Sequence, residues 1–236
     1  MPIGFFVCEE VRVPCAMIYA ISTLPAYRGH GFASSVTNML IEKGHESGHQ
    51  AVVLCPTNDS LFEFYGNHTT MRDWFYCCET AYDRASLAGK SCVSKAAFCS
   101  IGEYGALRES LLEEFCHIEY DERTLSYQHM LCMQSGGGYV TVSSFDGIAC
   151  AAIERDSENF RRFFVKEFLV DGISDVDALT SISILFNADE LIVRTPVRAI
   201  EDHTNARRFG MISSLDLPAH MLGISNHAPF YGFAFD

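Results

Sequence analysis

Two hydrophobic patterns alternate along the first third of the chain. Apolar stretches at residues 5–12, 16–24 and 51–55 predict strands, the first two joined through Val13-Pro14-Cys15. Between the second and third stretches, apolar residues recur at helical spacing and predict a helix up to His45; they are Phe32, Val36, Met39 and Leu40. This order predicts a strand–helix–strand crossover and an α/β fold.

The same reading predicts the later elements. They are strands at 74–80, 139–144, 148–154, 163–170 and 191–194, and helices at 103–116, about 123–133, and 176–186. The apolar face of the 103–116 helix is expected to comprise Leu107, Leu111, Leu112 and Phe115. Asp146-Gly147 is a hairpin signal, and Ser174 or Asp175 is expected to cap the last helix. Residues 82–100 show no clear period and are interpreted as a connection between two halves.

The run Gly136-Gly-Gly138 could suggest a phosphate loop, but it lacks the Lys-Ser/Thr pair that a P-loop requires. It is interpreted as a flexible link into the next strand.

The turn at residues 23–35, Thr-Leu-Pro-Ala-Tyr-Arg-Gly-His-Gly-Phe-Ala-Ser-Ser, joins the second strand to the first helix. Gly29 and Gly31 leave backbone N–H groups at the helix N-terminus with no Cβ beside them. Such donors, together with the positive end of the helix dipole, attract a pyrophosphate. We call residues 28–33 the cradle.

The cradle sequence, Arg28-Gly-His-Gly-Phe-Ala33, fits the RxxGxA pattern and resembles the GNAT (GCN5-related N-acetyltransferase) superfamily of acyltransferases. Asn58 and Tyr65 downstream keep the spacing of a family Asn that contacts coenzyme A and a Tyr that protonates the departing thiolate. The resemblance covers about residues 1–80. It departs from the family at Leu61, where a small residue is usual, and at Gly66-Asn67, where Gly-Phe is usual.

The resemblance implies acetyl-coenzyme A as cofactor and a set of binding residues. Main-chain groups near Ser22, Thr23 and Leu24 would hold the pantetheine, and Asn58 would contact a further part of coenzyme A. The pyrophosphate would be held by the cradle, which consists of Arg28, Gly29, His30, Gly31, Phe32 and Ala33. Tyr65 would be the general acid. The acceptor is expected to be a small-molecule or peptide amine.

The expected architecture is a GNAT-like mixed sheet with a smaller α/β half of similar element order. Residues 1–82 form the cofactor half, 83–135 a connecting and helical segment, and 136–236 a degenerate GNAT-like half. In that last half Asp171 and Asp175 replace the cradle, and two carboxylates would repel a pyrophosphate.

Only about twenty residues precede the cradle, fewer than GNAT domains usually have, so the first strand is expected to need cover. The cover, and with it a wall of the acceptor pocket, would come from the second half or from a partner in a homodimer.

The resulting hypothesis is direct attack of an amine on the acyl thioester, with Tyr65 protonating the sulfur. No residue stands out as general base; Tyr19, Glu63 and the C-terminal carboxylate of Asp236 are candidates on chemistry alone. The alternative hypothesis is a non-catalytic protein that binds acyl-coenzyme A or acts as a scaffold.

Charge and cysteine usage narrow the class further. The net charge of −13 argues against nucleic acid and anionic membranes as partners and favours a cationic acceptor such as an amine. Ten irregularly spaced cysteines, without a CxxC pair, a secretory signal or a membrane-length apolar run, predict a reduced, cytoplasmic protein. Cys77-Cys78 could oxidise or bind a soft metal, but adjacent half-buried strand thiols are the preferred interpretation.

His45-Glu-Ser-Gly-His49 spells HExxH, the zinc-protease pattern that needs both His on one face of a continuous helix. Gly48 is expected to end the helix, so no metal site is predicted here, and a zinc hydrolase remains the third hypothesis.

Overall fold

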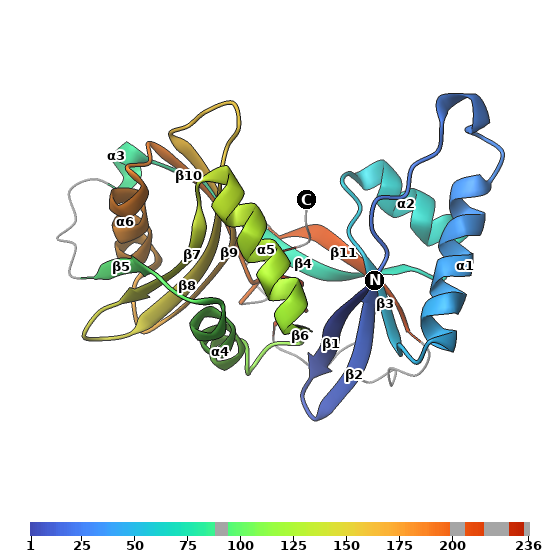
Figure 1. Ribbon diagram of the computed structural model, residues 1–236, viewed down its shortest axis with the longest axis horizontal. Coiled ribbons are helices and arrows are strands. Elements are labelled where there is room, and N and C mark those ends of the chain that lie inside the picture. Colours follow the sequence, from blue (N-terminus) through green and yellow to red (C-terminus); the bar gives the residue numbers. More distant parts are fainter. Residues whose placement is uncertain (88–93, 199–205, 215–226, 234–236) are drawn as a thin grey trace.

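One mixed sheet of eleven strands runs through the computed structural model, which describes residues 1–87, 94–198, 206–214 and 227–233 (Figure 1). The strand order is β5-β7-β8-β9-β10-β4-β11-β3-β2-β1-β6. The strands are β1 Pro2–Cys8, β2 Val11–Met17, β3 Ala51–Leu54, β4 Arg72–Asp83, β5 Lys95–Phe98, β6 His117–Tyr120, β7 Gly138–Ser143, β8 Ile148–Arg155, β9 Arg162–Asp171, β10 Glu190–Thr195 and β11 Ala206–Ser214. The helices are α1 Phe32–Glu46, α2 Asp59–His68, α3 Arg84–Leu87, α4 Ile101–Leu111, α5 Glu122–Ser135 and α6 Asp175–Phe186, with a 3-10 turn at Pro25–Tyr27.

The predicted strand–helix–strand crossover is formed by β2, α1 and β3, because β2 and β3 pair in parallel from Cys15 to Met17. The hairpin before it differs from the prediction. Its turn lies at Glu9-Glu10, where Glu9 adopts a left-handed backbone (φ 53°), and Pro14 lies inside β2, opposite Phe5. The predicted strand at 16–24 ends at Met17, since pairing with β3 stops there.

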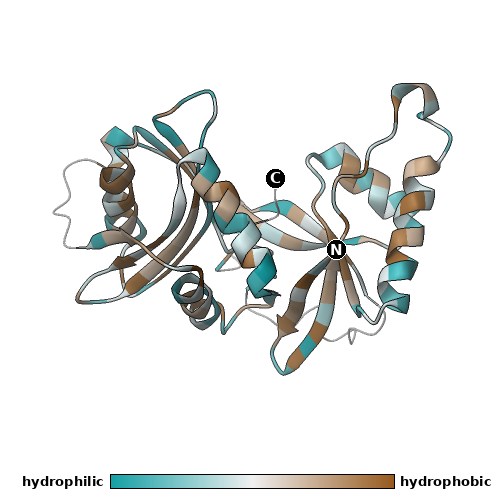
Figure 2. Ribbon diagram, viewed as in Figure 1, coloured by the Kyte–Doolittle hydropathy of each residue, from teal (hydrophilic) through white to brown (hydrophobic). Residues whose placement is uncertain are grey.

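Helix α1 has the predicted extent but buries a different face. Thr37 and Ile41 are its buried residues, whereas the apolar residues that predicted the helix are exposed by 43–67%. Those residues are Phe32, Val36, Met39 and Leu40, and Figure 2 shows apolar and polar bands alternating along α1. Periodicity therefore identified the helix and not its packing.

The outer edge of β1 is covered by β6, with Phe6 opposite Ile118 in antiparallel register. The expectation of a covered edge is confirmed, but the cover comes from the middle segment. Strand β6 can cover this edge because the helix predicted over 103–116 ends at Leu111. The chain then forms a short strand beside β1, in which Ile118 and Tyr120 are buried. Cys8 and Cys116, at the ends of this pairing, form a disulfide, which corrects the expectation that every cysteine is reduced.

The second half has the predicted order β7, β8, β9, α6, β10, with Ser174 capping α6 and Asp146-Gly147 in the β7–β8 turn. The segment 82–100 is more than a connection, since it contains α3 and β5, and β5 pairs with β7. The glycine run is also packed rather than flexible. Gly136 caps α5 with a left-handed backbone, and a Cβ at Gly137 would overlap the carbonyl oxygen of Ile153.

The two halves share strands across the centre of the sheet. Strand β4 pairs with β10 of the second half, and β11 lies between β4 and β3 of the first half (Figure 1). The hydrophobic pattern predicts no element at residues 206–214, where β11 lies. The last described strand of the chain therefore completes the sheet of the first half.

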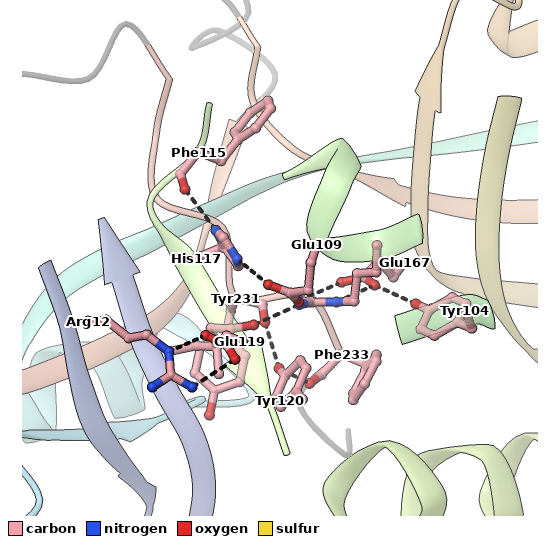
Figure 3. Close-up of polar contacts among 12 residues, drawn as sticks. Arg12, Tyr104, Glu109, Phe115, His117, Glu119, Tyr120, Glu167, Tyr231 and Phe233 are labelled. Atoms are coloured by element: carbon pink, nitrogen blue, oxygen red, sulfur yellow. Dashed lines mark hydrogen bonds and ion pairs between the residues drawn. The ribbon is translucent and has the colours of Figure 1, made fainter. Parts of the chain in front are cut away.

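A fully buried ion pair lies between the middle segment and the second half (Figure 3). Arg108 of α4 donates from Nε to Glu167 of β9 (2.8 Å) and from Nη1 to the carbonyl of Ile118 (2.8 Å). Tyr104 donates its hydroxyl to the same carboxylate. Burial by itself lowers the pKa of Arg108, but the nearby negative charges of Glu167 and Glu109 have a larger combined effect and raise the pKa of the guanidinium above its ordinary value. Breaking such a pair typically costs about 3–5 kcal/mol.

Candidate active site

A cleft of about 680 Å³ opens beside the N-terminus of α1. Its lining brings together most of the predicted cofactor residues, namely Ser22, Thr23, Arg28, Gly29, Gly31, Phe32 and Ala33, and also Tyr65. Two predicted residues, Leu24 and His30, are exposed on the same loop and do not line the cleft, and Asn58 does not line it either. The volume is within the usual range of small-molecule sites.

The cradle has the geometry that an anion needs. Gly29 and Gly31 adopt left-handed backbone conformations (φ 79° and 77°), which residues with a Cβ rarely adopt. Among the described atoms, a Cβ at Gly29 would meet nothing within 4 Å, and one at Gly31 only Ser34 Oγ at 3.9 Å. Gly31 is the N-cap of α1, and no side chain in the described ranges caps the helix there. The first N–H groups of α1 therefore face open space beside the cleft.

Arg28 is the cation of the cradle. Its Nε donates to the carbonyl of Thr23 (3.2 Å), which fixes the guanidinium against the loop that lines the cleft. The remaining donors of a guanidinium can engage a phosphate with a charge-assisted, bidentate geometry.

Tyr65 lies on α2, opposite the cradle across the cleft, and is buried. Burial raises the pKa of its hydroxyl above the ordinary tyrosine value. The hydroxyl therefore stays protonated at neutral pH, as a general acid requires.

Asn58, at the start of the same helix, has a structural role in this conformation. Its side-chain oxygen caps α2 by accepting from the N–H of Leu61 (3.1 Å) and the hydroxyl of Ser60 (2.7 Å).

A second cavity of about 300 Å³ adjoins the cleft through the residues that line both, Ile21, Leu61 and Tyr65. It lies where β2 and β3 diverge after their last pair, Met17 and Val53, and is otherwise lined by residues 17–20 and 54–57. Tyr65 is thus at the junction of the cleft and a second pocket between two strand ends.

The three candidate bases differ in position. Tyr19 lines the second cavity and is half exposed. Glu63 forms an ion pair with Arg208 (3.1 Å) and does not line either cavity. Asp236 lies outside the described residues.

Arg208 of β11 is a residue that the sequence analysis missed. It pairs with Asp59 (2.9 Å) and Glu63 on α2 and with Asp73 on β4 (3.1 Å), and its guanidinium lies 4.8 Å from the centre of the Phe62 ring. The hydrogen bonds that Arg208 donates to Asp59, Asp73 and Glu63 raise its pKa further above the ordinary arginine value. A strand from the end of the chain therefore holds the helix that carries Tyr65, and no local signal around residue 208 reports this.

The HExxH segment does not form one helix face. Helix α1 ends at Glu46, Gly48 has a left-handed backbone (φ 87°), and His49 follows it. Nδ1 of His45 lies 2.8 Å from the carbonyl oxygen of His49, and Nδ1 of His49 lies 3.3 Å from that of Gly44. Within the described ranges, no three His, Cys, Asp or Glu side chains gather as a metal site would require.

Cys77 and Cys78 occupy adjacent positions on β4, the first buried and the second half-buried. Burial raises the pKa of Cys77 to about 11.

No helix in the described part of the chain is both long and apolar enough to cross a membrane.

Comparisons with known proteins agree with this geometry. Residues 6–68, which contain the cradle and Tyr65, match the model of the acetyltransferase (GNAT) domain. No curated protein sequence matches the chain.

Solved structures resemble the chain over nearly all of its length. A GCN5-related N-acetyltransferase from Kribbella flavida aligns with a TM-score of 0.61 at 16% identity, covering 92% of this chain and 56% of that protein. One from Anabaena variabilis aligns with a TM-score of 0.59 at 14% identity, covering 91% and 58%. A tandem GNAT protein from the clavulanic acid biosynthesis pathway aligns with a TM-score of 0.51 at 8% identity, covering 88% and 79%.

The chain therefore has the GNAT fold, and its residues 6–68 match the model of a GNAT domain. It spans little more than half the length of the Kribbella and Anabaena proteins. A tandem GNAT protein among the similar structures agrees with the predicted likeness of the two halves.

Proposed function

We propose that the protein transfers an acetyl group, or another acyl group, from acyl-coenzyme A to an amine. The observation that carries the proposal is the cleft that joins a glycine-lined helix N-terminus, which no described side chain caps, to the largely buried Tyr65. The matched GNAT domain supports the same activity.

In the proposed complex, coenzyme A supplies the acyl group as an activated thioester. The cradle N–H groups and Arg28 bind the pyrophosphate, and main-chain groups of residues 22–24 hold the pantetheine. Tyr65, at the junction of the two cavities, then lies next to the sulfur.

The chemical step needs two proton transfers. The amine nitrogen loses a proton and forms the N–C bond, while the C–S bond breaks and Tyr65 gives its proton to the departing sulfur. The second cavity is the proposed acceptor side, and Tyr19 is the candidate base that lines it.

We further propose that residues 136–236 bind no coenzyme A of their own. The N-terminus of α6 supports this, because the Ser174 side chain accepts from the N–H of Asp177 and two carboxylates, Asp175 and Asp177, occupy the first turn. An anion would meet used donors and like charges there.

The test is acetyl transfer from acetyl-coenzyme A to a panel of polyamines, aminoglycosides and peptides, followed by release of the free thiol. We expect turnover with at least one amine that Tyr65→Phe lowers on the order of 100-fold without changing cofactor affinity. Tyr82→Phe is the matched control, because the pKa of Tyr82 is also raised by burial and it lines neither cavity of the site. Cofactor binding without transfer to any amine would favour a non-catalytic acyl-coenzyme A binding protein instead.

A further inference from the structure

A third cavity, of about 380 Å³, lies on the adjacent central strands β9, β10, β4 and β11, where the two halves meet, and is separate from the proposed acyl-transfer site. Its lining consists of Glu79, Phe164, Val165, Lys166, Ile192, Arg194 and Arg207. None of these residues lines the cleft or the second cavity. The cavity combines three cationic side chains with apolar ones in a protein whose net charge is −13.

The strand register places the charges on one face. Arg194 of β10 lies opposite Glu79 of β4, and Arg207 of β11 lies opposite Cys77, two residues from Glu79 on the same side of β4. Val193, the neighbour of Arg194, packs with the α6 core, so Arg194 faces away from α6.

Both guanidinium groups pack against the same aromatic ring, that of Phe209. Phe209 is buried, and its ring centre lies 4.3 Å from the guanidinium carbon of Arg194 and 5.3 Å from that of Arg207. Such cation–π contacts fix an arginine while leaving its in-plane N–H donors able to bind an anion.

Glu79 is the carboxylate that lines this cavity, and it reaches the two arginines unequally. One of its oxygens lies 2.8 Å from Arg207 and 3.5 Å from Arg194. Arg194 is 95% buried, and a charge in such surroundings interacts more strongly with an anion than a charge in water does. An anion that enters the cavity would therefore meet two fixed guanidinium groups and, among the described residues that line it, the competing carboxylate of Glu79.

We propose that this cavity binds a small organic anion, with its carboxylate or phosphate group between Arg194 and Arg207 and its apolar part against Phe164 and Ile192. Arginine pairs recognise both groups through the same bidentate geometry. The cavity volume is within the range of small-molecule sites.

The test is calorimetric titration of the full chain with benzoate and, separately, with phenyl phosphate, at constant ionic strength. Each probe carries one of the two anionic groups on the same ring, so the tighter binder identifies the preferred group. We expect one saturable site, weakened about tenfold or more by Arg207→Gln. Arg207 is 46% exposed in its side chain, so this variant is expected to fold.

Two further variants separate the proposal from its competitors. Arg28→Gln removes the cation of the cradle and should leave the affinity of this site unchanged, which excludes binding in the coenzyme A cleft. Glu79→Gln removes the competing carboxylate and should tighten binding about tenfold.

If Glu79 only completes a structural ion cluster, Glu79→Gln will destabilise the protein without creating tighter anion binding. That result, a lack of saturable binding by both probes, or binding that Arg28→Gln abolishes and Arg207→Gln does not, would overturn the proposal.

Discussion

The cradle offers the sharpest test of the proposed cofactor site, through the substitution Gly31→Val. Gly31 has a φ of 77° and caps α1, and a Cβ there would point into open space with only Ser34 Oγ, among the described atoms, within 4 Å. A valine would therefore fit the apoprotein sterically while filling the space where the pyrophosphate is proposed to lie.

The size of the effect follows from the contacts that a phosphate would lose. Charge-assisted hydrogen bonds contribute about 1.5–3 kcal/mol each, so losing two weakens binding at least about 100-fold. The backbone strain of a β-branched residue at positive φ costs about 1–3 kcal/mol of stability in addition. Affinity and stability must therefore be measured separately.

Gly48→Val is the matched control. Gly48 follows the other end of α1 with a φ of 87°, a Cβ there would meet no described atom within 4 Å, and the residue does not line the cleft. Calorimetry should show coenzyme A binding lost in Gly31→Val and retained in Gly48→Val, while thermal unfolding shows a similar loss of stability in both. Wild-type affinity in a folded Gly31→Val protein would refute the assignment of the cradle, and an equal loss of affinity in Gly48→Val would show that strain alone is responsible.

Three other predictions concern the acid, the helix that carries it and the covered edge. Burial raises the pKa of Tyr65, so the protonated acid should persist and turnover should fall only above about pH 10, and a pH–rate profile of Tyr65→Phe should lack this alkaline fall. Arg208→Gln frees α2 from β11, so it should lower kcat with little change in the KM for acetyl-coenzyme A. The melting temperature should change little, because partly exposed ion pairs are worth at most about 1 kcal/mol each. An unchanged kcat would contradict this role. Val7 lies on β1, between β2 and β6, and Val7→Pro removes one backbone donor of this strand, so it should destabilise the fold by about 1–3 kcal/mol or more. Amide exchange of residues 4–8 in the wild type should be slow. Exchange as fast as in a free peptide would contradict the covered edge.

Local chemistry made part of the fold predictable. The Asp146-Gly147 turn, the Ser174 cap and the end of α1 before Gly48 all depend on residues close together in sequence, and each is present in the structure. The cradle is of the same kind, because its turn needs left-handed backbones at residues 29 and 31, and glycine adopts them without a steric penalty.

The predicted site was only partly assembled as expected. Tyr65 lines the cleft from α2, a helix that the hydrophobic pattern did not predict. Asn58 keeps the family spacing, yet its oxygen is used to cap the helix that it begins. Spacing fixes where a residue falls on an element, and the neighbouring donors decide what its side chain does.

Long-range pairing was not predictable from the sequence alone. The sequence by itself determined the cradle, the crossover and the hairpin of the second half, since turn geometry and helix capping act over a few residues. The tertiary structure decided that β6 covers β1, that β11 enters between β3 and β4, and that Arg108 and Arg208 meet their carboxylates. These choices join residues about 60 to 160 positions apart, and they are favoured by burial of whole sheet faces, a free energy that no short stretch of sequence expresses.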